Sequence, residues 1–225
     1  MLHTTNGENY ILVRHLYSER EVRMNANHIN TSRGYWLAWF LASSMGYGIG
    51  ALLGMSFAYR LFPTDTFAND ITLGIVMGAT GGYFQWVVLR ERIPGAGLWG
   101  IASALGLGSA IGAVIAANLE ENYAPAVFLI GSVFGVVSGI LQWLILRRKL
   151  SRAGWWLLAN LVGSLVGAIA FSIAIAISEM GNWGLAAMAL GLVFGAGNGA
   201  ITGAALVWLL RQSGSKDVEG LAAAH

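Results

Sequence analysis

Five polar side chains stand in stretches of sequence that otherwise hold apolar and small residues: Gln85, Gln142, Asn160, Asn198 and Thr202. An amide or hydroxyl inside a membrane needs a hydrogen-bond partner, and a hydrogen bond between membrane helices contributes about 0.6 kcal/mol on average. One interpretation is structural, with these side chains joining helices to one another. The other is functional, with the same side chains lining a polar pocket or a path around the axis of a helical bundle.

No ionisable side chain accompanies these five residues in the apolar stretches. All four histidines lie in the tails, and the chain has no Cys. Histidine ligation of haem within the membrane and a Ser-His-Asp set are therefore excluded, and no zinc-binding spacing is present. A lipid-modifying enzyme would have to use interfacial residues such as His28, Asp70 or Glu179, which nothing in the sequence groups together. We expect a protein that is not an enzyme and that holds no metal, while the identity of any other cofactor stays open.

The helices that carry these residues can be predicted from where charged residues are missing in the sequence. The chain of 225 residues is 56% hydrophobic and 11% charged, whereas soluble domains carry roughly 25% charged residues. Six stretches contain no Asp, Glu, Lys or Arg: 34–59, 71–89, 95–119, 122–146, 153–178 and 180–210. A helix of about 20 apolar residues crosses a hydrocarbon core. The sequence therefore predicts an all-α integral membrane protein with six transmembrane helices.

Basic residues are distributed unevenly between the two ends of the predicted helices. If the six helices alternate in direction, 12 of the 13 Lys and Arg residues lie on the side of the termini, and only Arg60 lies on the other side. The positive-inside rule then places both termini in the cytoplasm. We expect a protein integral to a bacterial inner membrane. The net charge of +2 gives no reason to expect binding to nucleic acid.

A two-helix unit recurs three times along the chain. The odd-numbered stretches share a Trp, an Ala followed by a small polar residue, and a Gly, at the same offsets from Trp39, Trp99 and Trp156. The second and fourth stretches share glycines spaced by four, followed by Gln-Trp and Leu-Arg, whereas the sixth has Thr202 and Gly203 in place of Gln-Trp. Each unit begins and ends on the same side, so the repeats are parallel. They predict a pseudo-threefold bundle about the membrane normal.

The predicted organisation is a tail over 1–33, hairpins over 34–94, 95–152 and 153–211, and a tail over 212–225. In the first tail, residues 9–24 could form an amphipathic helix on the cytoplasmic surface of the membrane, or the tail could be mobile. We expect the second tail to be disordered.

Glycines four residues apart share one helix face and let a partner helix approach closely. We predict this packing at Gly74, Gly78, Gly82, Gly131, Gly135, Gly139, Gly191, Gly195, Gly199 and Gly203. A flat hydrophobic ligand against the same surface is the alternative. Because the even-numbered helices carry the longer rows of glycines, we expect them at the centre of the bundle.

Each even-numbered stretch closes on a Trp followed by an Arg, which is typical of an aromatic belt and a cation at the membrane surface. The predicted interfacial anchors are Trp86, Arg90, Trp143, Arg147, Trp208 and Arg211. Anionic lipid headgroups are the expected partners of these cations.

Many helix-packing features without a reactive group indicate a non-catalytic membrane protein. The interpretation that we favour is an accessory or scaffold subunit, packed against other membrane proteins, copies of itself, lipids or a flat hydrophobic ligand. The alternative is a channel or facilitator for a small neutral solute.

Overall fold

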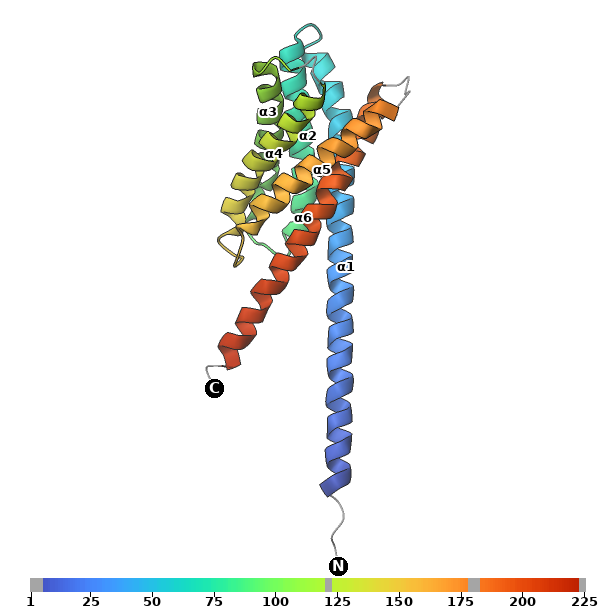
Figure 1. The fold of residues 1–225 in the computed structure, drawn as a ribbon, viewed down its shortest axis with the longest axis vertical. Helices are drawn as coiled ribbons and strands as arrows, with labels where there is room; N and C mark the ends of the chain where they lie inside the picture. The colour runs from blue at the N-terminus through green and yellow to red at the C-terminus, as the bar shows by residue number, and fades with distance from the viewer. Residues whose placement is uncertain (1–5, 120–122, 178–182, 223–225) are drawn as a thin grey trace, which may run out of the picture. The chain divides into compact units, whose positions relative to one another are not determined.

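The computed structural model describes the backbone of residues 6–119, 123–177 and 183–222, and the side chains of residues 32–119, 125–174 and 184–212. Its elements are α1 (Asn6–Leu61), α2 (Thr66–Leu89), the short 3-10 helix η1 (Ala96–Leu98), α3 (Trp99–Ala116), α4 (Tyr123–Leu146), α5 (Trp155–Ile177) and α6 (Trp183–Ala222) (Figure 1). The described residues contain no strand. The chain divides into two compact units, residues 1–35 and residues 36–225.

Six helices are long and apolar enough to cross a membrane. The candidate spans are 32–61, 66–89, 96–116, 125–146, 155–174 and 184–212. This confirms the prediction of an all-helical chain with six potential membrane-spanning helices. At the two ends of the chain the helices continue beyond the apolar stretches: α1 includes residues 9–24, and α6 runs to Ala222 through the segment for which we expect disorder.

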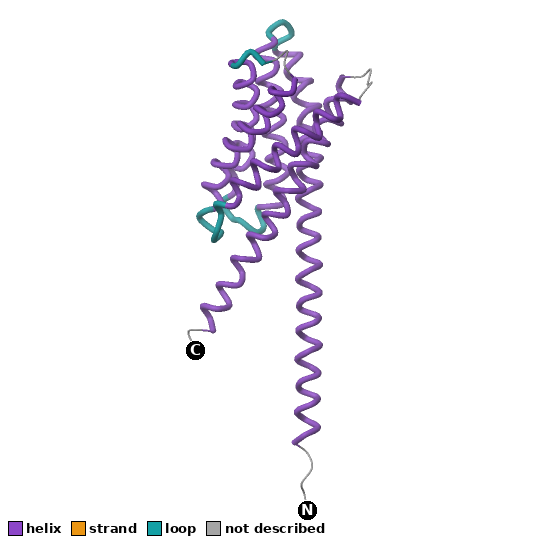
Figure 2. Tube along the Cα trace, in the orientation of Figure 1, coloured by secondary structure: helices purple, strands orange, loops and turns teal. Residues whose placement is uncertain are grey.

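The loops of the second unit gather at its two ends (Figure 2). One end, which we call the basic end, holds the loops over 90–95 and 147–154. The opposite end holds the loop over 62–65, where Asp65 caps α2 by accepting a hydrogen bond from the Ala68 N–H at 3.0 Å. A side-chain acceptor at this position satisfies one of the N–H groups that a helix start leaves unpaired.

The two loops at the basic end are built alike. The N–H of Ile93 donates to the carbonyl of Leu89, and the N–H of Leu150 donates to the carbonyl of Leu146, both at 2.9 Å. All four side chains are buried, so each turn folds an apolar residue back onto the end of the preceding helix. Gly95 then takes a φ of +93°, a left-handed conformation that costs glycine little.

The six helices form a closed ring in chain order. Helices α2 to α5 each pack against the next helix along the chain. Helix α1 closes the ring on both sides, since Gly50 lies against Met77 of α2 and Ser43 lies against Gly195 of α6. Odd- and even-numbered helices therefore share one layer. The expectation that the even-numbered helices lie at the centre is wrong, because their glycines mark contacts between neighbours in the ring.

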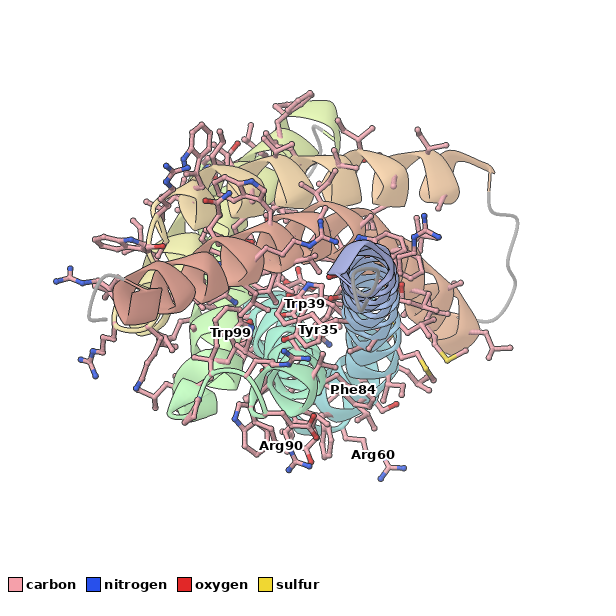
Figure 3. The ribbon with its side chains drawn as sticks, turned by 90° about the horizontal axis from the view of Figure 1, so that it is seen from below. Tyr35, Trp39, Arg60, Phe84, Arg90 and Trp99 are labelled. Atoms are coloured by element: carbon pink, nitrogen blue, oxygen red, sulfur yellow. The ribbon has the colours of Figure 1, made fainter. Side chains whose placement is uncertain are left out.

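The largest side chains inside this ring are aromatic. The three largest fully buried side chains, Trp39, Trp99 and Trp156, come from α1, α3 and α5. Figure 3 shows Trp39 and Trp99 among the helices, with Arg60 and Arg90 at the periphery of the view. Large exposed apolar side chains occur on all six helices, as expected for surfaces that face lipid.

Candidate functional site

Three tryptophans meet inside the ring, one from each predicted hairpin. The ring centroids of Trp39 and Trp99 lie 5.9 Å apart, those of Trp39 and Trp156 6.1 Å, and those of Trp99 and Trp156 5.4 Å. All three contacts are edge-on, the geometry that aromatic quadrupoles favour. Each indole is at most 1% exposed, so its N–H needs a partner within the protein.

The partners of the indole N–H groups come from the even-numbered helices. Nε1 of Trp99 donates to Oε1 of Gln85 at 2.9 Å, and Nε1 of Trp156 donates to Oε1 of Gln142 at 3.1 Å. In both pairs the residues are 14 positions apart. Nε1 of Trp39 donates to Oγ1 of Thr202 at 3.0 Å, across 163 positions. Thr202 thus accepts the third indole N–H at the place where the sixth helix lacks the Gln-Trp pair.

The amide nitrogens of the same network bind serine or glutamine side chains on neighbouring helices. Nε2 of Gln85 donates to Oγ of Ser43, and Nε2 of Gln142 donates to Oγ of Ser103, both at 3.0 Å. Nδ2 of Asn160 donates to Oε1 of Gln142 at 2.8 Å.

The circuit is completed on α5 and α6. Nδ2 of Asn198 donates to Oγ of Ser164 at 3.2 Å. Within single helices, the hydroxyls of Ser103, Ser164 and Thr202 donate to the carbonyl oxygens of Trp99, Asn160 and Asn198. The hydrogen bonds therefore run from α1 through α6, α5, α4, α3 and α2 and back to α1. We call this circuit the polar belt; its members are Trp39, Ser43, Gln85, Trp99, Ser103, Gln142, Trp156, Asn160, Ser164, Asn198 and Thr202.

Every member of the polar belt is at most 3% exposed, and none is ionisable. Including a bond from Asn160 to Ser138, eight side-chain to side-chain hydrogen bonds join neighbouring helices. At roughly 0.6 kcal/mol each, together they contribute about 5 kcal/mol, which is comparable to the whole stability of a small protein. Amides that are paired in this way and packed around three indoles do not line an open path, so the geometry favours the structural interpretation over the channel.

The ten glycines predicted to pack helices are all buried, and they lie at three alternate contacts around the ring. Those of α2 lie against α3, those of α4 against α5, and those of α6 against α1. A Cβ on Gly78 would lie 2.5 Å from the carbonyl oxygen of Ser103, and one on Gly195 would collide with the carbonyl oxygen of Ser43. At Gly139 the nearest atom would lie 3.4 Å away, at ordinary contact distance.

The predicted interfacial anchors lie near the basic end. The guanidinium carbon of Arg90 lies 5.5 Å from the ring centroid of Trp86, and that of Arg147 lies 5.0 Å from the ring centroid of Trp143. Such cation–π contacts contribute about 0.5–1 kcal/mol at exposed sites. Trp208 is exposed and meets the ring of Trp155 edge-on at 6.3 Å. The side chain of Arg211 is also exposed.

A second aromatic cluster lies further from the basic end. The rings of Tyr47, Phe134 and Phe194 lie 5.2–6.1 Å apart in all three pairs. Leu107 and Met77 pack against the cluster.

Beyond this aromatic cluster, a cavity of about 400 Å³ lies between the helices. Its lining includes Met55 of α1, Leu73 of α2, Ile111 of α3 and Phe171 of α5.

Five of the eleven members of the polar belt were predicted from the sequence as polar residues within the apolar stretches, and the other six were not. The repeat carried a signal for Trp39, Trp99, Trp156, Ser43 and Ser103, since these residues recur at fixed offsets, but no partner was assigned to them. Ser44 was also not anticipated: its hydroxyl and that of Ser151 are the only buried side-chain polar atoms without a partner among the described residues. In that part of the chain, no three His, Cys, Asp or Glu side chains are placed to hold a metal ion. Comparison with protein-family models, with curated proteins and with solved structures found no match.

Proposed function

We propose that this chain is a non-catalytic subunit of a membrane assembly, a scaffold or accessory protein that packs against other membrane proteins, copies of itself or lipids. The observation that carries the proposal is the polar belt. Its side chains hydrogen-bond to groups within the bundle, and every one of them is buried. None of them can gain or lose a proton at neutral pH. An enzyme or an ion-coupled transporter usually keeps a titratable group, a metal or an open polar site in its interior.

The architecture that supports this role is a pseudo-threefold bundle of three parallel hairpins. Two observations favour it: three equivalent tryptophans meet inside the ring, and the acceptor of each indole N–H lies on the even-numbered helix that precedes it around the ring. The same cyclic order holds for the glycine contacts of α2, α4 and α6. A rigid closed bundle leaves its outer face free for neighbours.

The proposed setting is a bacterial inner membrane with both termini in the cytoplasm. It rests on the 12 to 1 distribution of Lys and Arg in the sequence. The pairs Trp86–Arg90 and Trp143–Arg147 support it, because an aromatic ring beside an exposed cation suits a boundary with anionic headgroups.

Site-specific photocrosslinking in native membranes tests the proposal. A photoreactive amino acid replaces one exposed apolar residue on each helix in turn, at Leu53, Tyr83, Ile101, Phe128, Ile173 or Leu185. A partner protein covers one face of the bundle, so we expect a discrete protein adduct from a subset of the positions and lipid adducts from the rest. The buried position Leu146, at the basic end, serves as the matched control and should yield neither. Lipid adducts from all six positions would contradict a role as a subunit of an assembly.

A further inference from the structure

The cavity beyond the aromatic cluster is bounded by all six helices. Its volume is about 400 Å³, and α1, α3 and α6 contribute Ala51, Leu107 and Leu190 to the wall. Each helix that crosses the polar belt thus continues as a wall of the cavity. The space belongs to the centre of the ring, whereas a groove on the lipid-facing surface would have only two or three helices as walls.

The wall has a single chemical character, because every side chain that lines the cavity is apolar. Water is poorly stabilised there, since a buried water molecule needs two to four polar partners for its hydrogen bonds. Two of the lining residues, Met55 and Met77, have flexible side chains that adapt to an irregular apolar surface. The part of any ligand that occupies the cavity must therefore be hydrocarbon.

The size of the cavity limits how much of a ligand it can hold. An apolar cavity of about 150 Å³ already holds a benzene molecule. A cavity of about 400 Å³ has room for a hydrocarbon chain. The aromatic cluster of Tyr47, Phe134 and Phe194 closes one end, because Phe194 lines the cavity and also packs against the other two rings. A chain that enters cannot reach the polar belt.

We propose that this cavity holds one acyl chain of a membrane phospholipid, with the headgroup outside it. The proposal deepens the lipid-binding part of the proposed function. Phospholipid is the most abundant hydrocarbon-bearing molecule around a membrane helix, and the wall offers no polar side chain that would select a ligand by its polar groups. The bound chain completes the core of the half of the bundle that lies beyond the aromatic cluster, as the polar belt and its indoles fill the other half.

Photolabelling of the full chain tests the proposal directly. The protein is placed in nanodiscs of phosphatidylcholine, a fraction of which carries a diazirine in its palmitoyl chain, and labelled peptides are mapped by mass spectrometry. We expect labelling at Met77 and Leu107, which face the cavity, in addition to the lipid-facing residues Ile101 and Ile173. Labelling at the lipid-facing residues alone would overturn the proposal.

A substitution that fills the cavity can be compared with the same substitution outside it. Ala187 lines it, and Ala187→Phe should lower the labelling of Met77 and Leu107 by roughly tenfold, since a full-size ring competes for the same volume. Ala204 is exposed on the same helix, and Ala204→Phe should leave that labelling unchanged. Equal interior labelling in the two variants would contradict the proposal. Met55→Trp adds the same obstruction from α1, so a folding defect in one variant does not remove the test.

Two further outcomes separate this site from its alternatives. Solvent extraction of the purified protein, followed by mass spectrometry, detects any other apolar compound that is bound. If one such compound is found per chain and the phospholipid probe labels no interior residue, the proposal that the occupant is a phospholipid chain is overturned. The partner adducts sought at exposed positions are a separate measurement. Interior labelling without them supports the cavity site and argues against the role as a subunit.

Discussion

Gln142 and Gln85 occupy equivalent positions in the sequence pattern, but they carry different numbers of hydrogen bonds. Oε1 of Gln142 accepts from both Trp156 and Asn160, whereas Oε1 of Gln85 accepts from Trp99 alone. Each amide also donates to one serine hydroxyl. The polar belt is therefore more densely connected on α4 than on α2, and the two glutamines should differ in their contribution to stability.

We expect Gln142→Leu to lower the free energy of unfolding by about 2 kcal/mol and Gln85→Leu by about 1 kcal/mol, because a buried donor without a partner costs about 1–3 kcal/mol. The loss at Gln142 is limited because Nδ2 of Asn160 keeps its bond to Ser138. Unfolding by sodium dodecyl sulfate in mixed micelles measures both values. Ser172→Ala, which removes a bond within one helix, is the control. Equal losses for the two glutamines would refute this account of the belt.

Thr202 allows the link between the first and last helices to be measured. Thr202→Val keeps the shape of the side chain but leaves Nε1 of Trp39 without its acceptor, so we expect a loss of about 1 kcal/mol. In a double-mutant cycle with Trp39→Phe, the second substitution should cost less in the Val background than in the native one. Additive effects would show that the bond between these two side chains contributes nothing.

At the scale of the elements, the glycines at the contacts between helices are of two kinds. Gly195 of α6 faces a backbone carbonyl of α1, which cannot move aside without shifting the helix. Gly139 of α4 faces the side chain of Asn160 at ordinary contact distance. Equal spacing in the sequence therefore conceals unequal room in the structure.

This difference predicts opposite outcomes for two identical substitutions. Gly195→Ala should destabilise the bundle by about 2 kcal/mol, because overpacking costs about 1–3 kcal/mol. Gly139→Ala should be neutral or stabilising by up to about 1 kcal/mol, since Ala favours a helix more than Gly does. Thermal unfolding of the two variants in the same detergent measures the difference. A loss at Gly139 as large as that at Gly195 would contradict the contacts.

The sequence predicts which segments form the helices but not how the helices are arranged in the bundle. Six candidate spans followed from the lack of charge, because a charged side chain near the middle of the hydrocarbon core is costly. The position of the helices relative to the centre did not follow, because a row of glycines is equally compatible with a central helix and with a contact between neighbours. For the same reason Gln85 and Gln142 were recognised as polar residues in need of partners, while Trp39, Trp99 and Trp156 were not recognised as those partners.

For the whole molecule, the orientation in the membrane can be tested directly because the chain has no native Cys. Glu91 and Thr64 are exposed at opposite ends of the second unit, in the loops after and before α2. We expect Glu91→Cys to react with a membrane-impermeant maleimide only in inside-out vesicles and Thr64→Cys only in intact spheroplasts, since basic loops stay in the cytoplasm. The native chain is the control for background labelling. The reverse pattern would overturn the assigned orientation.

The bond between Trp39 and Thr202 has a consequence for biogenesis. During synthesis the first helix enters the membrane about 160 residues before its partner on the last helix exists. Until then, the face of α1 that carries Trp39, Ser43 and Tyr47 has no α6 to cover it, because the contacts of Gly191, Gly195 and Gly199 are still to form. In a chain without the third hairpin, these side chains would lack the contacts that α6 supplies. The indole N–H of Trp39 therefore gains its acceptor, and the polar belt closes, only after α6 has been synthesised.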